Sequence, residues 1–181
     1  MVELSRTSPK FLENLLTLEV PELKDEKIII ESSARIPGSR SKIALISTSP
    51  QIDAIGAIVG VKGVRINAVS KELSGENIDC IEYSSVPEMF IARALSPALV
   101  NSVKIEEYPK NGEKGKAVVT INSEQKSKAI GKAGLNIRLA SMLTKYDIEI
   151  VEIETGVTAS NSEIKKDEKI TDASSLEALF K

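Results

Sequence analysis

The sequence predicts an α+β protein made of two copies of one small module, followed by a flexible C-terminal tail. The pattern aliphatic-Gly-x-x-Gly-x-x-Ile occurs at 59–66 and again 71 residues later, at 130–137. The flanks of the two copies also agree, because a strand-like stretch precedes the glycines and another follows them. We therefore expect each copy to form helix-strand-strand-helix-helix-strand.

The first module, residues 1–83, begins at Ser8-Pro9, a helix cap followed by a proline that suits the first turn. Pro37-Gly38 predicts a type II turn between two strands. The remaining elements are expected in this order: strands at 27–35 and 42–48, a short helix from Pro50 capped by Ser49, a helix at 64–73 and a strand at 77–82.

The second module, residues 84–154, begins at Ser85-Val86-Pro87-Glu88, which predicts a capping box, and its first helix stops near Ser96-Pro97. The later elements are strands at 100–108 and 115–121, helices within 123–145 capped by Ser123, and a strand at 147–153. One core of this size contributes only about 3–5 kcal/mol. Because the connection is also short, we expect the modules to pack together in a fixed relation.

The tail, residues 155–181, has the composition of a disordered linker, with small polar residues followed by a charged run. Its end, 174–180, has the pattern of one amphipathic helical turn. Two interpretations stay open, a frayed terminus and a docking peptide that orders on a partner.

Composition excludes several classes of function. The 181 residues contain no His, so Ser-His-Asp and Cys-His catalysis and most zinc sites are unavailable, and we predict no enzyme activity, metal or cofactor. The single cysteine, Cys80, fits a small buried hydrophobe better than a reactive thiol. No apolar stretch approaches the ~18 residues of a membrane span, and Glu3 and Arg6 interrupt any signal peptide. We expect a soluble cytoplasmic protein without a membrane partner.

The two Gly-x-x-Gly segments are the candidate ligand sites. Glycine at both ends lets another backbone approach closely, and the helix that follows offers free N–H groups to an anion. The expected RNA-binding residues are Gly60, Val61, Lys62, Gly63 and Arg65 in the first module, and Gly131, Lys132, Ala133, Gly134, Asn136 and Arg138 in the second. Helix–helix elbows without a ligand are the alternative.

Charge supports a polyanionic ligand. The net charge of the chain is −2, but segments 34–71 and 110–145 together hold fourteen basic and three acidic residues. These segments therefore carry a net charge of +11, and the rest of the chain carries −13. The Pro-Gly turn does not explain Arg35 and Arg40 beside it, so one of them is expected to contact RNA or to brace the neighbouring module, and Lys42 joins the RNA-binding candidates.

Aromatic residues are too scarce for base stacking, with three Tyr, three Phe and no Trp. A groove that clamps the backbone through Gly-x-x-Gly and seats bases on aliphatic side chains needs none, and this is how KH modules bind about four nucleotides each.

The chain resembles the tandem KH region of the NusA family of bacterial transcription termination and antitermination factors. The resemblance covers 4–154 and includes Ala34-Arg35-Ile36-Pro37-Gly38-Ser39-Arg40, Gly75-Glu76-Asn77-Ile78-Asp79 and Asn136-Ile137-Arg138-Leu139-Ala140. It implies type II KH modules, each a three-stranded mixed sheet packed against helices, that bind nascent single-stranded RNA. RNA polymerase and other transcription factors are the partners it implies for the full-length protein.

Two functions follow as hypotheses. The first is single-stranded RNA binding through both loops. The second is a protein-interaction scaffold with weakened RNA binding, which Ala133 favours because the family usually has a basic residue there.

Overall fold

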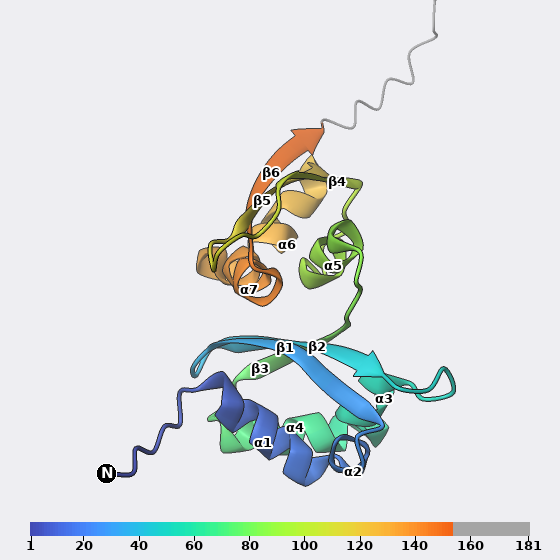
Figure 1. Cartoon of the computed structure of the whole chain (residues 1–181), viewed down its shortest axis with the longest axis vertical. Coiled ribbons are helices and arrows are strands. Elements are labelled where there is room, and N and C mark those ends of the chain that lie inside the picture. The colour runs from blue at the N-terminus through green and yellow to red at the C-terminus, as the bar shows by residue number, and fades with distance from the viewer. Residues whose placement is uncertain (154–181) are drawn as a thin grey trace, which may run out of the picture.

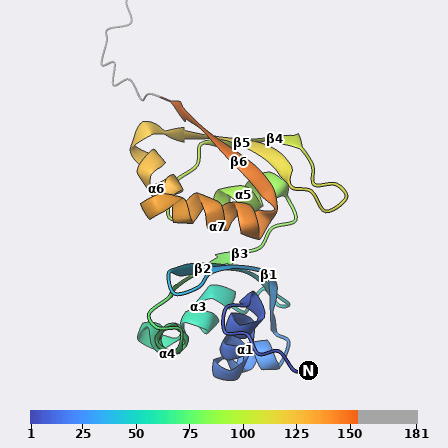
Figure 2. The ribbon, with the colours of Figure 1, turned by 90° about the vertical axis from the view of Figure 1, so that its left-hand side faces the viewer.

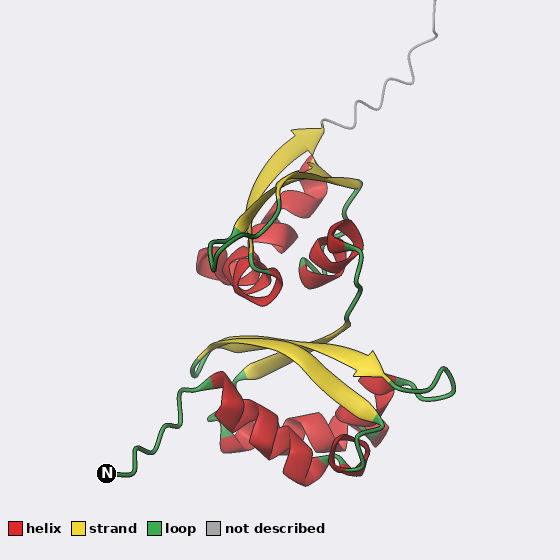
Figure 3. Cartoon of the chain, viewed as in Figure 1, coloured by secondary structure: helices red, strands yellow, loops and turns green. Residues whose placement is uncertain are grey.

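The computed structural model describes residues 1–153, which form two modules stacked along the long axis (Figures 1 and 3). The first contains α1 (Pro9–Glu19), α2 (Pro21–Lys24), β1 (Ile28–Ile36), β2 (Arg40–Ser47), α3 (Ala54–Val59), η1 (Val61–Gly63), α4 (Val64–Glu72) and β3 (Asn77–Glu82). The second contains α5 (Pro87–Ala94), β4 (Ser102–Glu107), β5 (Gly115–Asn122), η2 (Ser123–Gln125), α6 (Lys126–Ile130), η3 (Lys132–Gly134), α7 (Leu135–Thr144) and β6 (Tyr146–Ile153). The predictions for the tail, 155–181, lie outside the described residues.

Each module has a three-stranded mixed sheet, which confirms the predicted α+β class. In the first sheet β1 pairs antiparallel with β2, and β2 pairs parallel with β3; β4, β5 and β6 repeat this arrangement. The predicted turn between β1 and β2 is present, because Ser39 N–H donates to the Ile36 carbonyl over 3.1 Å and Gly38 has φ +76°. The third strand of each sheet, β3 or β6, lies at an edge.

The helix caps agree with the sequence prediction at only one of four places. Ser8 caps α1 by accepting from Lys10 N–H. Helix α3 begins four residues later than expected, at Ala54, and its cap is Asp53, while the Ser49 hydroxyl bonds Gln51 instead. No side chain caps α5, so the predicted capping box is wrong, and Ser123 lies inside η2, where its hydroxyl donates to the Ile153 carbonyl.

The inner face of the first sheet carries the core of the first module. Helices α1, α3 and α4 cover this face (Figure 1). Ile43 and Leu45 of β2 are fully buried there against Leu12, Leu16 and Ile58 of the helices. Within residues 1–153 no helix is long and apolar enough to cross a membrane.

The outer face of the first sheet is covered by the second module. Figure 2 shows α7 lying across β1 and β2, and both strands contact it. Ala34, Ala44 and Ile81 are buried there and belong to the same apolar cluster as the core of the second module. The contact is also polar, because Ser32 Oγ donates to the Leu143 carbonyl over 2.8 Å. The first sheet is therefore buried on both faces.

The outer face of the second sheet is open by comparison. Lys104, Lys116 and Glu149 are exposed on it, and Val151 keeps 43% of its surface accessible. The two sheets have the same topology but differ in what covers this face.

This difference predicts that a glutamate introduced on the outer face destabilises the first sheet more than the second. Ala44→Glu places a carboxylate in the buried contact between the modules and should lower the free energy of unfolding by about 3–5 kcal/mol. Val118→Glu, between the exposed Lys104 and Glu149 on the second sheet, should cost less than about 1 kcal/mol. Urea unfolding measures both values. Equal losses would contradict burial of the outer face of the first sheet.

Cys80 faces the helices from the edge strand β3, paired with Ile43. Burial, assisted by the nearby Asp79 carboxylate, raises the pKa of the Cys80 thiol to about 12. The thiolate is the reactive form, so the folded environment makes this cysteine inert.

Alkylation measures this effect. At about pH 8, iodoacetamide should modify Cys80 roughly a hundredfold more slowly in the folded protein than in denaturant, where the thiol has its ordinary pKa near 8.5. Mass spectrometry of timed samples gives both rates. A folded-state rate close to the denatured one would show that the thiol is accessible and ionised.

Candidate nucleic-acid interface

The two Gly-x-x-Gly loops have the same backbone conformation. The first glycine has φ/ψ of 74°/173° at Gly60 and 73°/175° at Gly131. The third residue is left-handed although it is not glycine, with 54°/25° at Lys62 and 53°/26° at Ala133. Such conformations cost about 1–3 kcal/mol each and are typical of functional sites. Their occurrence at both copies of the repeat points to a shared role.

The first glycine of each loop makes room for a bracing side chain five residues later. A Cβ on Gly60 would lie 2.8 Å from Cγ of Arg65, and one on Gly131 would lie 2.7 Å from Cβ of Asn136. Arg65 donates to the Ala57 carbonyl over 2.8 Å, and Asn136 donates to the Lys128 carbonyl over 3.2 Å. Both acceptors lie eight residues before the donor. Arg65 and Asn136 thus hold each loop against the helix before it.

The tips of the loops are open to solvent. Val61 is 82% exposed, and Lys62, Lys132 and Ala133 are also exposed. Helices α4 and α7 start directly after the loops, and no side chain caps either N-terminus. Free N–H groups, the positive end of the helix and a lysine therefore converge at each loop, an arrangement that suits a phosphate.

A hollow of 260 Å³ lies beside the first loop. Ile55, Val59 and Ile66 form its apolar wall on α3 and α4, and four consecutive residues of β3, 78–81, form the opposite wall. Because consecutive strand residues point to opposite faces, this hollow borders the edge of β3 and its unpaired backbone groups. Ser96 and Pro97 of the second module complete the rim, so both modules shape it.

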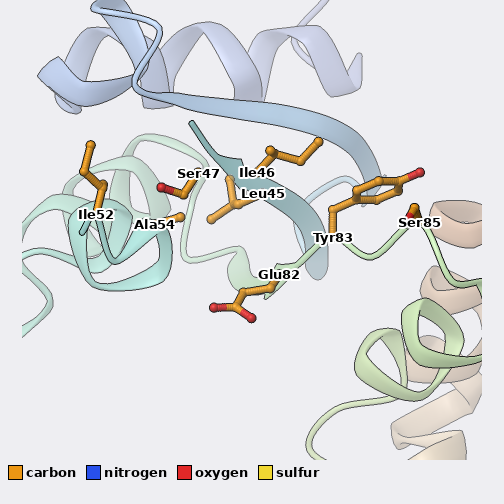
Figure 4. Close-up of a pocket in the computed structure, with 8 residues that line it drawn as sticks. All are labelled: Leu45, Ile46, Ser47, Ile52, Ala54, Glu82, Tyr83 and Ser85. Carbon is orange, nitrogen blue, oxygen red and sulfur yellow. The ribbon is translucent and has the colours of Figure 1, made fainter. Parts of the chain in front are cut away.

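A second hollow of 320 Å³ follows where β3 ends. Figure 4 shows that its lining comes from the end of β2, the start of α3 and the connection between the modules, including Tyr83 and Ser85. The two hollows succeed each other along β3. Figure 2 also shows α4 and α6, which flank the two loops, on the same side of the molecule.

Three of the predicted RNA contacts are buried in the folded chain. Arg35 pairs with Glu76 at 2.9 Å, with side-chain exposures of 3% and 0%, and it also donates to the Ser8 carbonyl. Asn136 has no exposed surface, and its amide donates to the carbonyls of Leu95 and Ala129 as well as to that of Lys128.

Lys42 is the third buried residue, and it joins the two modules. Its ammonium donates to the Ser96 carbonyl over 2.8 Å and lies 3.2 Å from Oδ2 of Asp79. Burial lowers the pKa of the Lys42 ammonium, and Asp79 opposes this effect. We remove Arg35, Lys42 and Asn136 from the RNA contacts, because a ligand cannot reach them without unfolding the chain.

The other predicted residues remain accessible to different degrees. Arg138 is exposed, and Arg40 is partly exposed at the rim of the 260 Å³ hollow. Arg65 is held by Glu22 at 3.0 Å in addition to its bracing role. Sequence reasoning missed Asp79, which bonds Arg40 at 2.6 Å inside that hollow. Its only sequence signal is an acid between apolar strand residues, a pattern that also fits an ordinary solvated face.

Folding neutralises half of the basic residues in the two positive segments. The ion-paired ones are Arg35, Arg40, Lys42, Arg65, Lys114, Lys116 and Lys126, and every partner lies outside the segments. Lys62, Lys132 and Arg138 form no ion pair within residues 1–153. The sequence-level charge of +11 thus overstates the binding surface, while the cations at the two loops stay available.

Comparison with protein families agrees with this geometry. Residues 6–83 match the NusA-like first KH domain, and residues 87–157 match the NusA-like second KH domain. The crystal structure of APE1850 is similar in fold, with a TM-score of 0.55 and 20% identity over 77% of this chain and 96% of that one.

Curated relatives share much more of the sequence. Proteins named transcription termination/antitermination protein NusA are 49% identical in Helicobacter pylori, over 100% of this chain and 50% of the relative, and 48% identical in Thermus thermophilus, over 83% and 38%. The chain thus spans half or less of the length of these relatives, whose name describes a transcription factor and not an enzyme. Two adjacent matching domains and this level of identity show that the chain belongs to the NusA-like tandem KH family.

Proposed function

We propose that this chain binds single-stranded RNA through both Gly-x-x-Gly loops, as the tandem KH region of a bacterial transcription termination and antitermination factor. The observation that carries the proposal is the identical strained backbone of the two loops, each followed by an uncapped helix. For the whole protein we propose nascent RNA as the ligand, RNA polymerase and other transcription factors as partners, and the cytoplasm as the location.

In this proposal the loops contact the phosphates of the RNA, and the 260 Å³ hollow holds its bases. The backbone N–H groups of Val61 and Lys62, and those of Lys132 and Ala133, take the phosphates, because the N–H groups of the loop glycines and of the residue after each loop already donate to carbonyls of the chain. Lys62, Lys132 and Arg138 add charge. Bases then lie against Val59, Ile66 and the edge of β3, where aliphatic side chains and free backbone groups replace aromatic stacking.

Acidic residues at the loops should abolish RNA binding. The fourfold variant Val61→Asp, Lys62→Asp, Lys132→Asp, Ala133→Asp repels phosphate and should weaken binding of a short unstructured RNA at least about a hundredfold. All four side chains are exposed, and Asp tolerates the left-handed backbone at 62 and 133, so thermal unfolding should change little. Filter binding and calorimetry provide the two measurements.

A matched variant controls for net charge. Asn101→Asp, Lys104→Asp, Lys110→Asp and Asn111→Asp change the charge by the same amount but lie around β4, at the opposite edge of the second sheet from β6. This variant should keep most of the affinity. Equal losses in both variants would reject the loops as the binding site, and unaltered binding in the loop variant would do so outright.

Salt dependence tests the number of phosphate contacts. If each module neutralises two to three phosphates, the slope of log affinity against log salt should be roughly −3 to −4, from about −0.7 per phosphate on single strands. Titrations at several salt concentrations give this slope. Absence of saturable, salt-sensitive binding would reject RNA binding and favour the protein-interaction scaffold.

A further inference from the structure

The 260 Å³ hollow contains one ion pair among its otherwise apolar and backbone lining. Arg40 Nε lies 2.6 Å from Oδ2 of Asp79, and both side chains are 27% exposed. Lys42 is fully buried, and its Nζ lies 3.2 Å from the same Oδ2. Arg40 and Lys42 therefore hold the Asp79 carboxylate in place through one of its two oxygens.

The ion pair leaves one oxygen of the Asp79 carboxylate, Oδ1, available as a hydrogen-bond acceptor. Among residues 1–153, Oδ1 of Asp79 accepts no hydrogen bond, and neither terminal nitrogen of Arg40 donates one. An ionised carboxylate only accepts, and a guanidinium only donates. The hollow thus offers an acceptor beside a donor, next to the apolar wall where the proposed function seats a base.

We propose that Asp79 selects bases with an exocyclic amino group in the first module, so that cytosine is preferred to uracil at this position. The inference rests on the proposed function. Cytosine presents an N4 amino donor where uracil presents the O4 acceptor. The amino group donates to Asp79 Oδ1, and the adjacent acceptors of cytosine take N–H groups from Arg40. Uracil instead turns an oxygen toward the carboxylate and loses this contact.

The second module supplies a control position. The strand registers pair Lys42 with Asp79 and Lys116 with Asp147, so Asp147 is the structural counterpart of Asp79, and Glu149 lies two residues further along β6 on the same face. Glu149 is exposed and forms no ion pair within the described residues, so its carboxylate is not held in place. Glu149→Gln removes the same charge as Asp79→Asn without removing a fixed acceptor.

Fluorescence anisotropy with two short RNAs, oligo-C and oligo-U, tests the inference. The unmodified chain should bind oligo-C about tenfold more tightly, the discrimination expected from a hydrogen bond to a charged group. Asp79→Asn should reduce this ratio to about one, because an amide both donates and accepts, whereas Glu149→Gln should leave it unchanged. An RNA with N4,N4-dimethylcytidine, which has no amino donor, should bind the unmodified chain like oligo-U.

The outcomes separate this inference from the proposed function. Equal affinity for the two RNAs, or an unchanged ratio in Asp79→Asn, overturns base selection by Asp79 while RNA binding stands. Binding of neither RNA overturns the proposed function itself. If Asp79→Asn unfolds for want of a partner for Lys42, tight binding of the dimethylated RNA to the unmodified chain overturns the inference without any substitution.

Discussion

The packing of the second module on the outer face of the first sheet is the contact on which the rest of the structure depends. A module of this size has a marginal core of its own, so burial of Ala34, Ala44 and Ile81 extends one core through both modules. The contact also places Ser96 and Pro97 at the rim of the hollow beside the first loop. One interface therefore supplies stability, fixes the two loops relative to each other and completes the first base-binding hollow.

The burial and pairing of Lys42 depend on the same contact between the modules. Lys42 is buried where the second module covers the sheet, and its ammonium pairs with Asp79 and donates to the Ser96 carbonyl. A buried, paired lysine contributes little net stability, but it fixes the geometry of its partners. The surface charge is reduced in turn, since half of the cations in the positive segments pair with acids. Of the seven basic residues in these segments that form no ion pair within residues 1–153, Lys62, Lys132 and Arg138 lie at or directly after the loops, where an RNA backbone needs them.

The sequence was sufficient to predict the repeat, the order of the elements and the two loops, because these depend on local patterns of glycine, proline and apolar residues. It was insufficient for residues whose role is set by distant partners. Arg65 and Asn136 follow the loops as a ligand contact would, yet both brace the fold. Arg35 finds Glu76 forty-one residues away. The caps at Ser49 and Ser123 failed for a similar reason, since other partners bind those hydroxyls.

The distance between the two loops in solution tests most directly whether they form one rigid surface. Spin labels on Lys62→Cys and Lys132→Cys, in a Cys80→Ser background, report it by electron–electron double resonance, and both positions are exposed. Because the second module is packed on the first sheet, we expect a single narrow distribution of the distance between the two labels, and we expect RNA not to change it. A broad or multimodal distribution in the free protein would show that the modules move independently and would contradict the shared core.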